Sequence, residues 1–181
     1  MPTVFLSPST QEYNLYITST GSEEYWMNLI TDAMIPYLEA SGIQYGRNDP
    51  DGTVGTSVRM SNEGNYDFHL AIHSNASPET MPGAFQGPNI YYFTTSQLGQ
   101  QAAEIFAKNF RAIYPNPELV ITVPTTALYE LRNTIAPAVL VEVAYHDNWS
   151  DATWIQDNVD AIARAMVLSL TEYFGVPFVN P

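Results

Sequence analysis

The sequence predicts an α/β protein: a single domain with about six strands in a mostly parallel, twisted sheet flanked by helices. Short runs rich in β-branched residues alternate with longer segments of helical apolar spacing, a pattern typical of repeated strand–helix–strand units. A length of 181 residues suits one compact domain with one core. The expected strands lie at residues 3–6, 43–47, 68–73, 89–93, 119–123 and 139–143.

Three longer segments carry apolar residues at helical spacing and have recognisable ends. We expect helices over residues 22–42, 97–114 and 150–174. Ser22 and Ser150 are good N-cap residues, and Gly42 and Gly175 are suitable helix ends.

The boundaries and the irregular segments follow from the same reading. Residues 1–175 are expected to form the domain, and residues 176–181 a C-terminal tail or the start of a linker. Two long loops, at residues 48–56 and 77–88, are expected to border a binding site, because loops of this length in compact domains are often functional.

Composition excludes several functional classes. Six Lys and Arg against 19 Asp and Glu give a net charge of −13, which excludes a nucleic-acid binder that works by neutralising phosphates. The absence of cysteine excludes disulfides, a Cys-ligated metal and a Cys nucleophile. No apolar run approaches the roughly 20 residues of a membrane span, and no signal peptide is expected at the amino terminus.

Two residues on predicted strands point to chemistry. His73 ends the strand at residues 68–73, where α/β sheets present ligand-binding groups; the alternative is a core histidine that is hydrogen-bonded to Asn75. Glu142 lies inside an apolar strand. A buried glutamate is costly unless it is paired, metal-linked or protonated, so Glu142 is the candidate general acid or base.

Further polar residues surround these two in the predicted sheet. Glu23 and Glu24 open the first helix, where the helix dipole favours acids; that explanation suffices for Glu23 but competes with a metal role for Glu24. His69 lies about 13 Å from His73 along the strand and is interpreted as structural. His146 follows the last strand, as a site wall or a loop residue. A histidine and two glutamates at one sheet edge suit a hydrolytic zinc site.

Three runs of sequence resemble the zinc-dependent N-acetylmuramoyl-L-alanine amidases of the amidase type 3 family. They are AIHSNA at residues 71–76, LYELRNT at 128–134 and PAVLVEVAYHDN at 137–148, and the resemblance extends from Val4 to about Phe174. It implies hydrolysis of the amide between the lactyl group of N-acetylmuramic acid and the L-alanine of the peptidoglycan stem. It also implies peptidoglycan as the partner and an extracellular or cell-wall location.

The resemblance implies roles for individual residues. His73 matches a zinc ligand of the family, Glu24 matches another because it lies four residues before Asn28, and Glu142 matches the catalytic glutamate. Arg132 and Asn75 are the candidate substrate-binding residues. For Arg132 the alternative is a structural salt bridge.

The sequence departs from the family at the first zinc ligand. Family members hold a histidine in the loop after the first strand, and the corresponding residue here is Tyr13. A neutral phenol is a poor zinc ligand, so we rank Glu12 first as the third ligand, ahead of Gln11 and Tyr13. The alternative function is a catalytically inactive peptidoglycan-binding domain that has lost one zinc ligand.

Overall fold

The computed structural model describes all 181 residues and confirms the six-stranded sheet. The strands lie in the spatial order β2-β1-β3-β6-β4-β5, and all neighbours are parallel except β4 and β6. Their bounds are β1 (Thr3–Pro8), β2 (Gln44–Arg47), β3 (Phe68–Asn75), β4 (Asn89–Phe93), β5 (Ile121–Thr125) and β6 (Ala138–Tyr145). Each of the six predicted strands is therefore present, and the sheet is mostly parallel.

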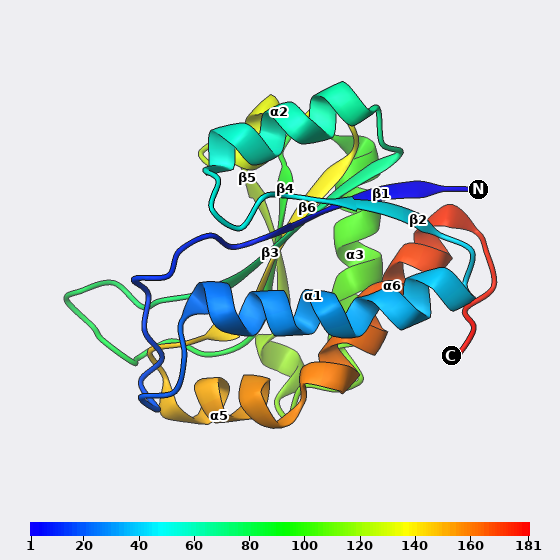
Figure 1. Cartoon of the computed structure of the whole chain (residues 1–181). Coiled ribbons are helices and arrows are strands. Elements are labelled where there is room, and N and C mark those ends of the chain that lie inside the picture. Colours follow the sequence, from blue (N-terminus) through cyan, green and yellow to red (C-terminus); the bar gives the residue numbers. More distant parts are fainter.

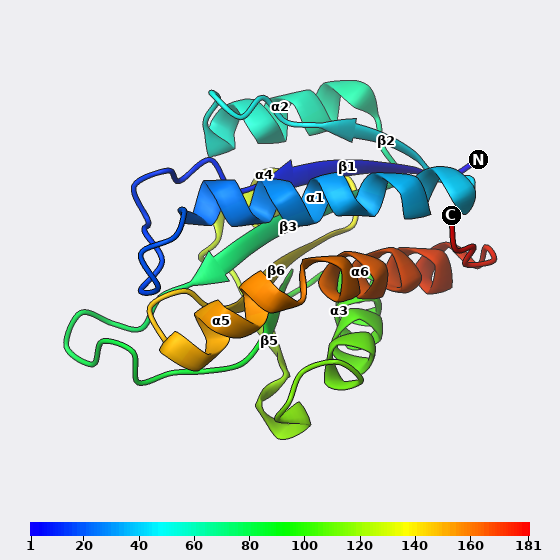
Figure 2. The same cartoon turned by 60° about the horizontal axis from the view of Figure 1, so that its bottom comes forward.

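Helices cover both faces of this sheet (Figures 1 and 2). The α-helices are α1 (Glu23–Ala40), α2 (Val54–Gly64), α3 (Gln97–Arg111), α4 (Tyr129–Asn133), α5 (Trp149–Asp157) and α6 (Val159–Phe174). Helices α1, α3 and α6 lie on one face, α2 and α4 on the other, and α5 lies near the end of the sheet at which β3 and β6 finish. No helix is both long enough and apolar enough to cross a membrane.

Two features of the helices differ from the sequence-based expectation. The single helix expected over residues 150–174 is two helices, because Asn158 leaves helical geometry at φ −126° and ψ 25°. Its side-chain amide donates to the carbonyl of Trp154, which satisfies one of the open carbonyls at the end of α5. The loop expected at residues 48–56 runs into α2, whose N-cap Thr53 and Thr56 form a reciprocal capping box.

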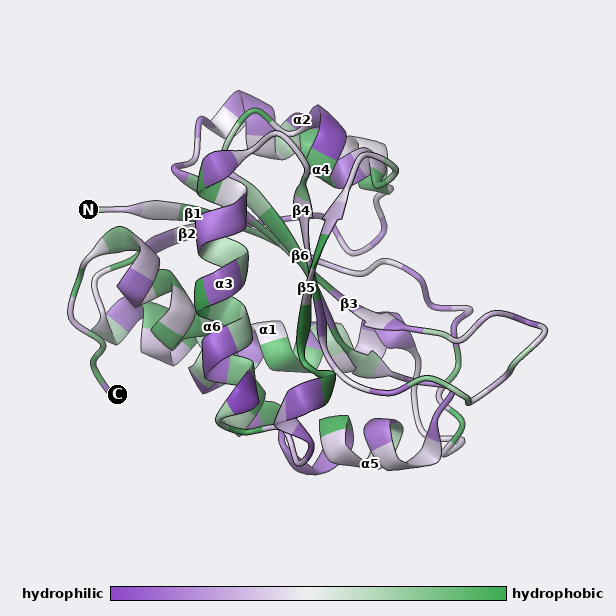
Figure 3. Cartoon of the chain, turned by 180° about the vertical axis from the view of Figure 1, so that it is seen from behind, coloured by the Kyte–Doolittle hydropathy of each residue, from purple (hydrophilic) through white to green (hydrophobic).

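The two faces of the sheet carry very different cores. The face under α1, α3 and α6 belongs to a cluster of 32 buried hydrophobic residues, whereas the cluster on the other face contains only Ala71, Leu131, Ala138 and Leu140. Figure 3 shows the apolar strands in the middle of the molecule and the mixed polar and apolar surfaces of the helices around them. The apolar interaction that stabilises the domain is therefore concentrated on one side of the sheet.

Strand alternation determines what the thinner face presents. Along β3, Phe68, Leu70 and Ile72 enter the large core, so the alternate residues His69, Ala71 and His73 point to the other face. Glu142 of β6 pairs in register with His73. The fold thus places a histidine and a glutamate next to each other on a face with little apolar cover.

Candidate active site

His73 lies between two carboxylates at the carboxyl end of β3. Its Nδ1 atom lies 2.9 Å from Oε1 of Glu23, and its Nε2 atom lies 3.5 Å from Oε2 of Glu130. The side chain of His73 is 16% exposed, whereas both glutamates are almost completely buried. Both ring nitrogens therefore face acids, and one edge of the imidazole stays open to solvent.

Glu23 reaches His73 from the first residue of α1. Ser22 caps this helix by accepting a hydrogen bond from the backbone N–H of Tyr25, which fixes the helix end against the sheet edge. Asn14 donates to Oε2 of Glu23 at 2.7 Å. Burial alone would raise the pKa of Glu23, but the hydrogen bond and the positive charge of His73 outweigh it, with help from Asn14, and lower the pKa.

Glu130 reaches the same histidine from α4 on the opposite side. Its Oε1 atom accepts hydrogen bonds from the hydroxyl of Ser7 and from Nε2 of His69, the latter at 2.9 Å. Nδ1 of His69 lies 2.9 Å from the hydroxyl of Ser61 on α2. Burial opposes ionisation of Glu130, but the bonds from His69 and His73 hold its pKa well below the usual range. His69 is thus buried and structural, as interpreted from the sequence.

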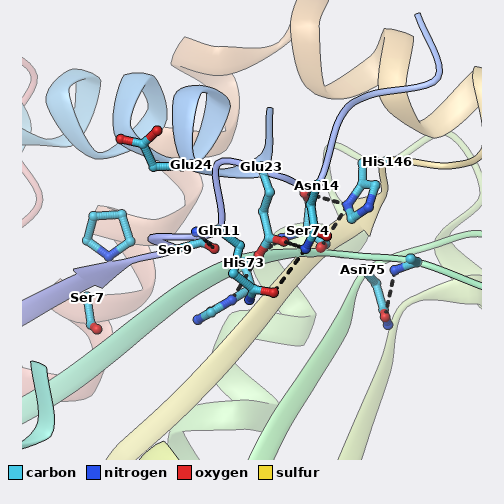
Figure 4. A network of polar contacts seen from close by, with 12 residues as sticks. Ser7, Ser9, Gln11, Asn14, Glu23, Glu24, His73, Ser74, Asn75 and His146 are labelled. Atoms are coloured by element: carbon cyan, nitrogen blue, oxygen red, sulfur yellow. Dashed lines mark hydrogen bonds and ion pairs between the residues drawn. The ribbon is translucent and has the colours of Figure 1, made fainter. Parts of the chain in front are cut away.

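The environment of His73 favours its charged form. Burial by itself lowers the pKa of an imidazole, but the hydrogen bonds with Glu130 and Glu23, together with the charges of Glu23 and Glu142, raise it well above the ordinary value. We call the connected set Glu23, His73, Glu130 and His69 the acid–histidine chain. Figure 4 shows two of its members, Glu23 and His73.

Glu142 stands beside this chain without a hydrogen-bonding partner. It is partly buried on β6, in register with His73 on one side and with Asn89 of β4 on the other. Its Oε2 atom is covered and has no hydrogen-bond partner. Burial raises the pKa of Glu142 to about 7, the positive charge of His73 lowers it in part, and the charge of Glu23 adds to the rise.

The first helix contributes Glu23 to the site, rather than the neighbouring residue singled out from the sequence. Figure 4 shows the Glu23 carboxylate directed at His73, and that of Glu24 directed away from it. Glu24 instead borders a separate shallow hollow together with the exposed Glu12. Consecutive helical residues differ by about 100° around the axis, so only one of the two glutamates faces the sheet edge.

The loop after β1 supplies no third acid or imidazole next to Glu23 and His73. No group of three or more His, Asp or Glu side chains is placed to hold a metal ion. Tyr13 is 74% exposed and donates to Oε1 of Gln11, which also accepts from the Asn14 amide that binds Glu23. An amide N–H₂ donor therefore lies against Glu23, where a third metal ligand would have to offer a lone pair.

The two predicted substrate-binding residues lie in different places. Asn75 ends β3 two residues after His73, and its side chain accepts from the backbone N–H of Ala76. Arg132 is exposed on the last turn of α4 and borders a hollow with Ala138, at the start of β6. Four residues of strand, about 13 Å, separate Ala138 from Glu142, so Arg132 does not join the acid–histidine chain.

His146 turns out to be a buried structural residue. Its Nδ1 atom lies 3.0 Å from the backbone carbonyl of Ser74, and its ring stacks on Tyr16 with centroids 5.5 Å apart. It therefore supports the end of β3 from the core side rather than lining the site.

A polar cavity opens beside His73 on the side of β1 and α2. It has a volume of about 370 Å³, and only two of its thirteen lining residues are hydrophobic. His73 and Glu130 contribute to its wall, as do hydroxyl and carboxamide side chains from the loop after β1 and from the region of α2. We refer to it below as the polar cavity.

Glu130 was not identified from the sequence as a site residue. Helix α4 has five residues, too few for a helical pattern to show which side faces inward. The one local signal was its place between Tyr129 and Leu131.

The family model described as N-acetylmuramoyl-L-alanine amidase matches residues 14–172. The chain is 28% identical over 180 residues to N-acetylmuramoyl-L-alanine amidase LytC of Bacillus subtilis. The matched region covers 95% of this chain and 35% of LytC. The chain thus spans about a third of the length of this relative.

Solved structures share the fold. N-acetylmuramoyl-L-alanine amidase AmiC2 of Nostoc punctiforme superposes with a TM-score of 0.82 at 18% identity, covering 96% of this chain and 97% of AmiC2. An N-acetylmuramoyl-L-alanine amidase from Clostridium difficile 630 gives a TM-score of 0.81 at 18% identity, with the same coverage.

The acid–histidine chain predicts a large stability cost for losing Glu130. The Glu130→Gln substitution removes the charge that faces His69 and His73, and breaking a buried pair of this kind costs about 3–5 kcal/mol. Because folding lowers the pKa of Glu130, the stability that its charge contributes is fully present above about pH 4.5. Because folding raises the pKa of His73, the stability that its charge contributes is fully present below about pH 6.5. Urea unfolding at pH 5.5 measures the loss.

The matched control is Glu39→Gln, which changes an exposed glutamate that has no side-chain hydrogen bond and is expected to shift stability by less than about 0.5 kcal/mol. Equal effects of the two substitutions would show that Glu130 is not a buried, paired charge.

Replacing Glu142 is expected to stabilise the protein, whereas replacing Glu130 is expected to destabilise it. Because burial raises its pKa to about 7, ionisation of Glu142 opposes folding as pH rises above about 4.5, and the penalty is complete above about pH 7. Glu142→Gln removes that penalty, so we expect the variant to exceed the wild type by up to about 3 kcal/mol at pH 8 and to match it near pH 4.5. Urea unfolding at the two pH values checks this, and a variant less stable at pH 8 would contradict it.

Proposed function

The chain belongs to the N-acetylmuramoyl-L-alanine amidase family, and from this premise we propose that it hydrolyses the amide bond between N-acetylmuramic acid and L-alanine in peptidoglycan. The observation that carries the proposal is Glu142, a carboxylate with an unpartnered oxygen and a pKa raised to about 7, on the strand next to His73. Such a group is suited to accept a proton near neutral pH.

Glu142 acts as the general base in this proposal. It takes a proton from a water molecule while the water oxygen bonds to the lactyl carbonyl carbon. The same proton then passes to the alanine nitrogen as the carbon–nitrogen bond breaks, which leaves a carboxylic acid and a free amine. A pKa near the working pH favours both transfers, because the group accepts and releases the proton with little cost.

His73 contributes charge rather than proton transfer. The bonds to Glu23 and Glu130 keep the imidazole cationic and hold its ring plane, so a fixed positive charge lies beside Glu142 where negative charge develops on the carbonyl oxygen. Asn75 is proposed to contact the substrate, because it lies two residues beyond His73 on the same face of β3.

Zinc is the cofactor that the family resemblance implies, and the side chains present do not make up its usual ligand set. A catalytic zinc is held by three protein ligands that face one point. Here Glu23 and Glu130 face opposite nitrogens of His73, Glu130 is already bonded to Ser7 and His69, and no three of these groups are placed to hold a metal ion. Of the three ligands predicted from sequence, Glu12 and Glu24 lie elsewhere. The chemistry above therefore uses the residues of the chain alone.

The implied location follows from the substrate. Peptidoglycan lies outside the cytoplasmic membrane, so the proposed activity is exerted in the extracellular space or the cell wall. The net charge of −13 gives no long-range attraction to an anionic wall, so recognition depends on contacts within the site.

A second candidate function is a peptidoglycan-binding domain without catalytic activity. The observation that favours it is the incomplete ligand set, because the loop after β1 offers the amide of Asn14 rather than an imidazole or carboxylate to the Glu23 and His73 pair. Binding to intact sacculi without release of alanine would distinguish this function from the first.

The amidase proposal predicts new amino-terminal alanine in digests of purified peptidoglycan. Glu142→Gln is expected to lower the rate of its release by 100-fold or more, as for the loss of a general base. Below pH 7 the wild-type rate should rise about tenfold per pH unit and level off above it, because Glu142, facing His73 and Glu23, must be ionised. Glu104→Gln, an exposed acid on α3, is the control. No alanine from the wild type would reject the amidase.

The placement of Glu23 and Glu24 on α1 predicts that only Glu23 affects the affinity for zinc. With two ligands in place, zinc titrated by calorimetry should bind weakly to the wild type, and Glu23→Gln should weaken it further, whereas Glu24→Gln should leave it unchanged. Tight binding of one zinc per chain, or loss of zinc in Glu24→Gln alone, would contradict this placement.

A further inference from the structure

A second cavity lies between the end of β4, the start of α3, the end of α4 and the segment that leads into β6. Its volume of about 530 Å³ is within the range of ligand sites, roughly 300–1,000 Å³. We call it the Arg132 cavity, because Arg132 is the one charged residue among the twelve that line it. It shares no lining residue with the polar cavity. A ligand bound there would therefore be separate from His73 and Glu142.

Arg132 is the one lysine or arginine of the chain whose side chain has no partner. The other five are engaged in ion pairs, in a hydrogen bond to a backbone carbonyl or over an aromatic ring: Arg47, Arg59, Lys108, Arg111 and Arg164. Glu130 lies two residues before Arg132, about 200° around the helix, and is bonded to His69 and His73. The exposed guanidinium of Arg132 is thus free to bind an anion.

The lining of the Arg132 cavity contains no aspartate or glutamate, in a chain that has 19 of them. By contrast, Glu130 lines the polar cavity, and the shallow hollow at Glu24 also contains Glu12 and Asp51. A carboxylate in the Arg132 cavity would meet a guanidinium and no like charge at contact distance. The distribution of charge therefore favours an anionic ligand in this cavity.

The remainder of the lining is half apolar and half polar. Six of the twelve residues are hydrophobic, and two of these, Leu98 and Ile135, are 51% and 82% exposed. Thr95 and Gln97 are exposed as well and offer a hydroxyl and a carboxamide. A phosphate ion would leave the apolar half uncovered, and a fatty acid would desolvate the polar half without replacing its hydrogen bonds. A ligand that matches both halves combines a carboxylate, amide groups and small apolar side chains.

We propose that the Arg132 cavity binds the free carboxyl terminus of a short peptide with small apolar side chains. The guanidinium would hold the terminal carboxylate through two parallel N–H···O bonds, which fix its orientation. Thr95 and Gln97 would bond to the peptide groups, and Leu98 and Ile135 would cover the side chains. A terminus of D configuration would point to peptidoglycan stem peptides, and one of L configuration to a protein. The inference does not depend on the proposed amidase activity.

The test titrates the full chain with two dipeptides that differ only at the terminus. One is Nα-acetyl-alanyl-alanine with a free carboxylate, the other is its carboxyl-terminal amide, and each is made from L and from D residues. Inorganic phosphate is the probe for a simple anion. Backbone amide shifts in NMR spectra report both the dissociation constant and the residues contacted. Salt at about 0.15 M screens the net charge of −13 beyond about 8 Å.

The free carboxylate is expected to shift the amides of residues 95–98 and 134–136 and to bind at least tenfold more tightly than the amide or phosphate. Arg132→Gln should weaken the carboxylate tenfold or more and leave the amide unchanged, because only the charge-assisted bonds are lost. Arg132→Lys keeps the charge without the planar fork and should weaken it by a smaller factor. Arg59→Gln removes an exposed arginine outside the cavity and, as the matched control, should change neither affinity.

Three outcomes would overturn the proposal: equal affinity for the carboxylate and the amide, tighter binding of phosphate than of the dipeptide, or shifts confined to residues around His73. An Arg132→Gln variant that binds the carboxylate as tightly as the wild type would overturn it as well. Tighter binding of the D or of the L dipeptide supports the site in both cases and identifies the source of the terminus. Because the two cavities share no lining residue, these results are distinct from those of the alanine-release assay.

Discussion

The placement of His73 between two buried carboxylates is the interaction on which the site depends. Each acid comes from a different helix: Glu23 begins α1 and Glu130 lies on α4. Two carboxylates in nearly complete burial would be costly alone, and the shared imidazole offsets that cost by pairing with both. Removing His73 would leave Glu23 without its basic partner and Glu130 with His69 alone, so His73 is needed for the arrangement of the neighbouring helices as well as for chemistry.

The uneven core explains why the site lies where it does. One face of the sheet buries 32 clustered residues and supplies most of the apolar stabilisation, so the other face is free to carry histidines and glutamates. Strand alternation then determines the result: the residues of β3 between Phe68, Leu70 and Ile72 must point to the thin face. The stability of the large core thus supports a polar face that would be marginal in isolation.

The presence of the six strands and the order of strands and helices along the chain were predictable from the sequence, because apolar runs and helix-capping residues are local patterns that can be read directly. The site was predictable only in part. His73 and Glu142 follow from strand position, but the choice of Glu23 over Glu24 depends on the angle at which α1 meets the sheet edge, which no local pattern encodes. Glu130 was missed because its partners, His69 and His73, lie 61 and 57 residues away in sequence.

The same sequence distances bear on how the chain folds. Glu23 and His73 are 50 residues apart in the sequence, and the strands that flank Glu142 on β6 are β3 and β4. A contact between residues so far apart in the sequence closes a long loop, and the entropy cost of closing that loop must be met before the contact adds to stability. The acid–histidine chain needs β3 and the ends of α1 and α4 in their final places, so we expect its hydrogen bonds to be complete only once these elements have assembled.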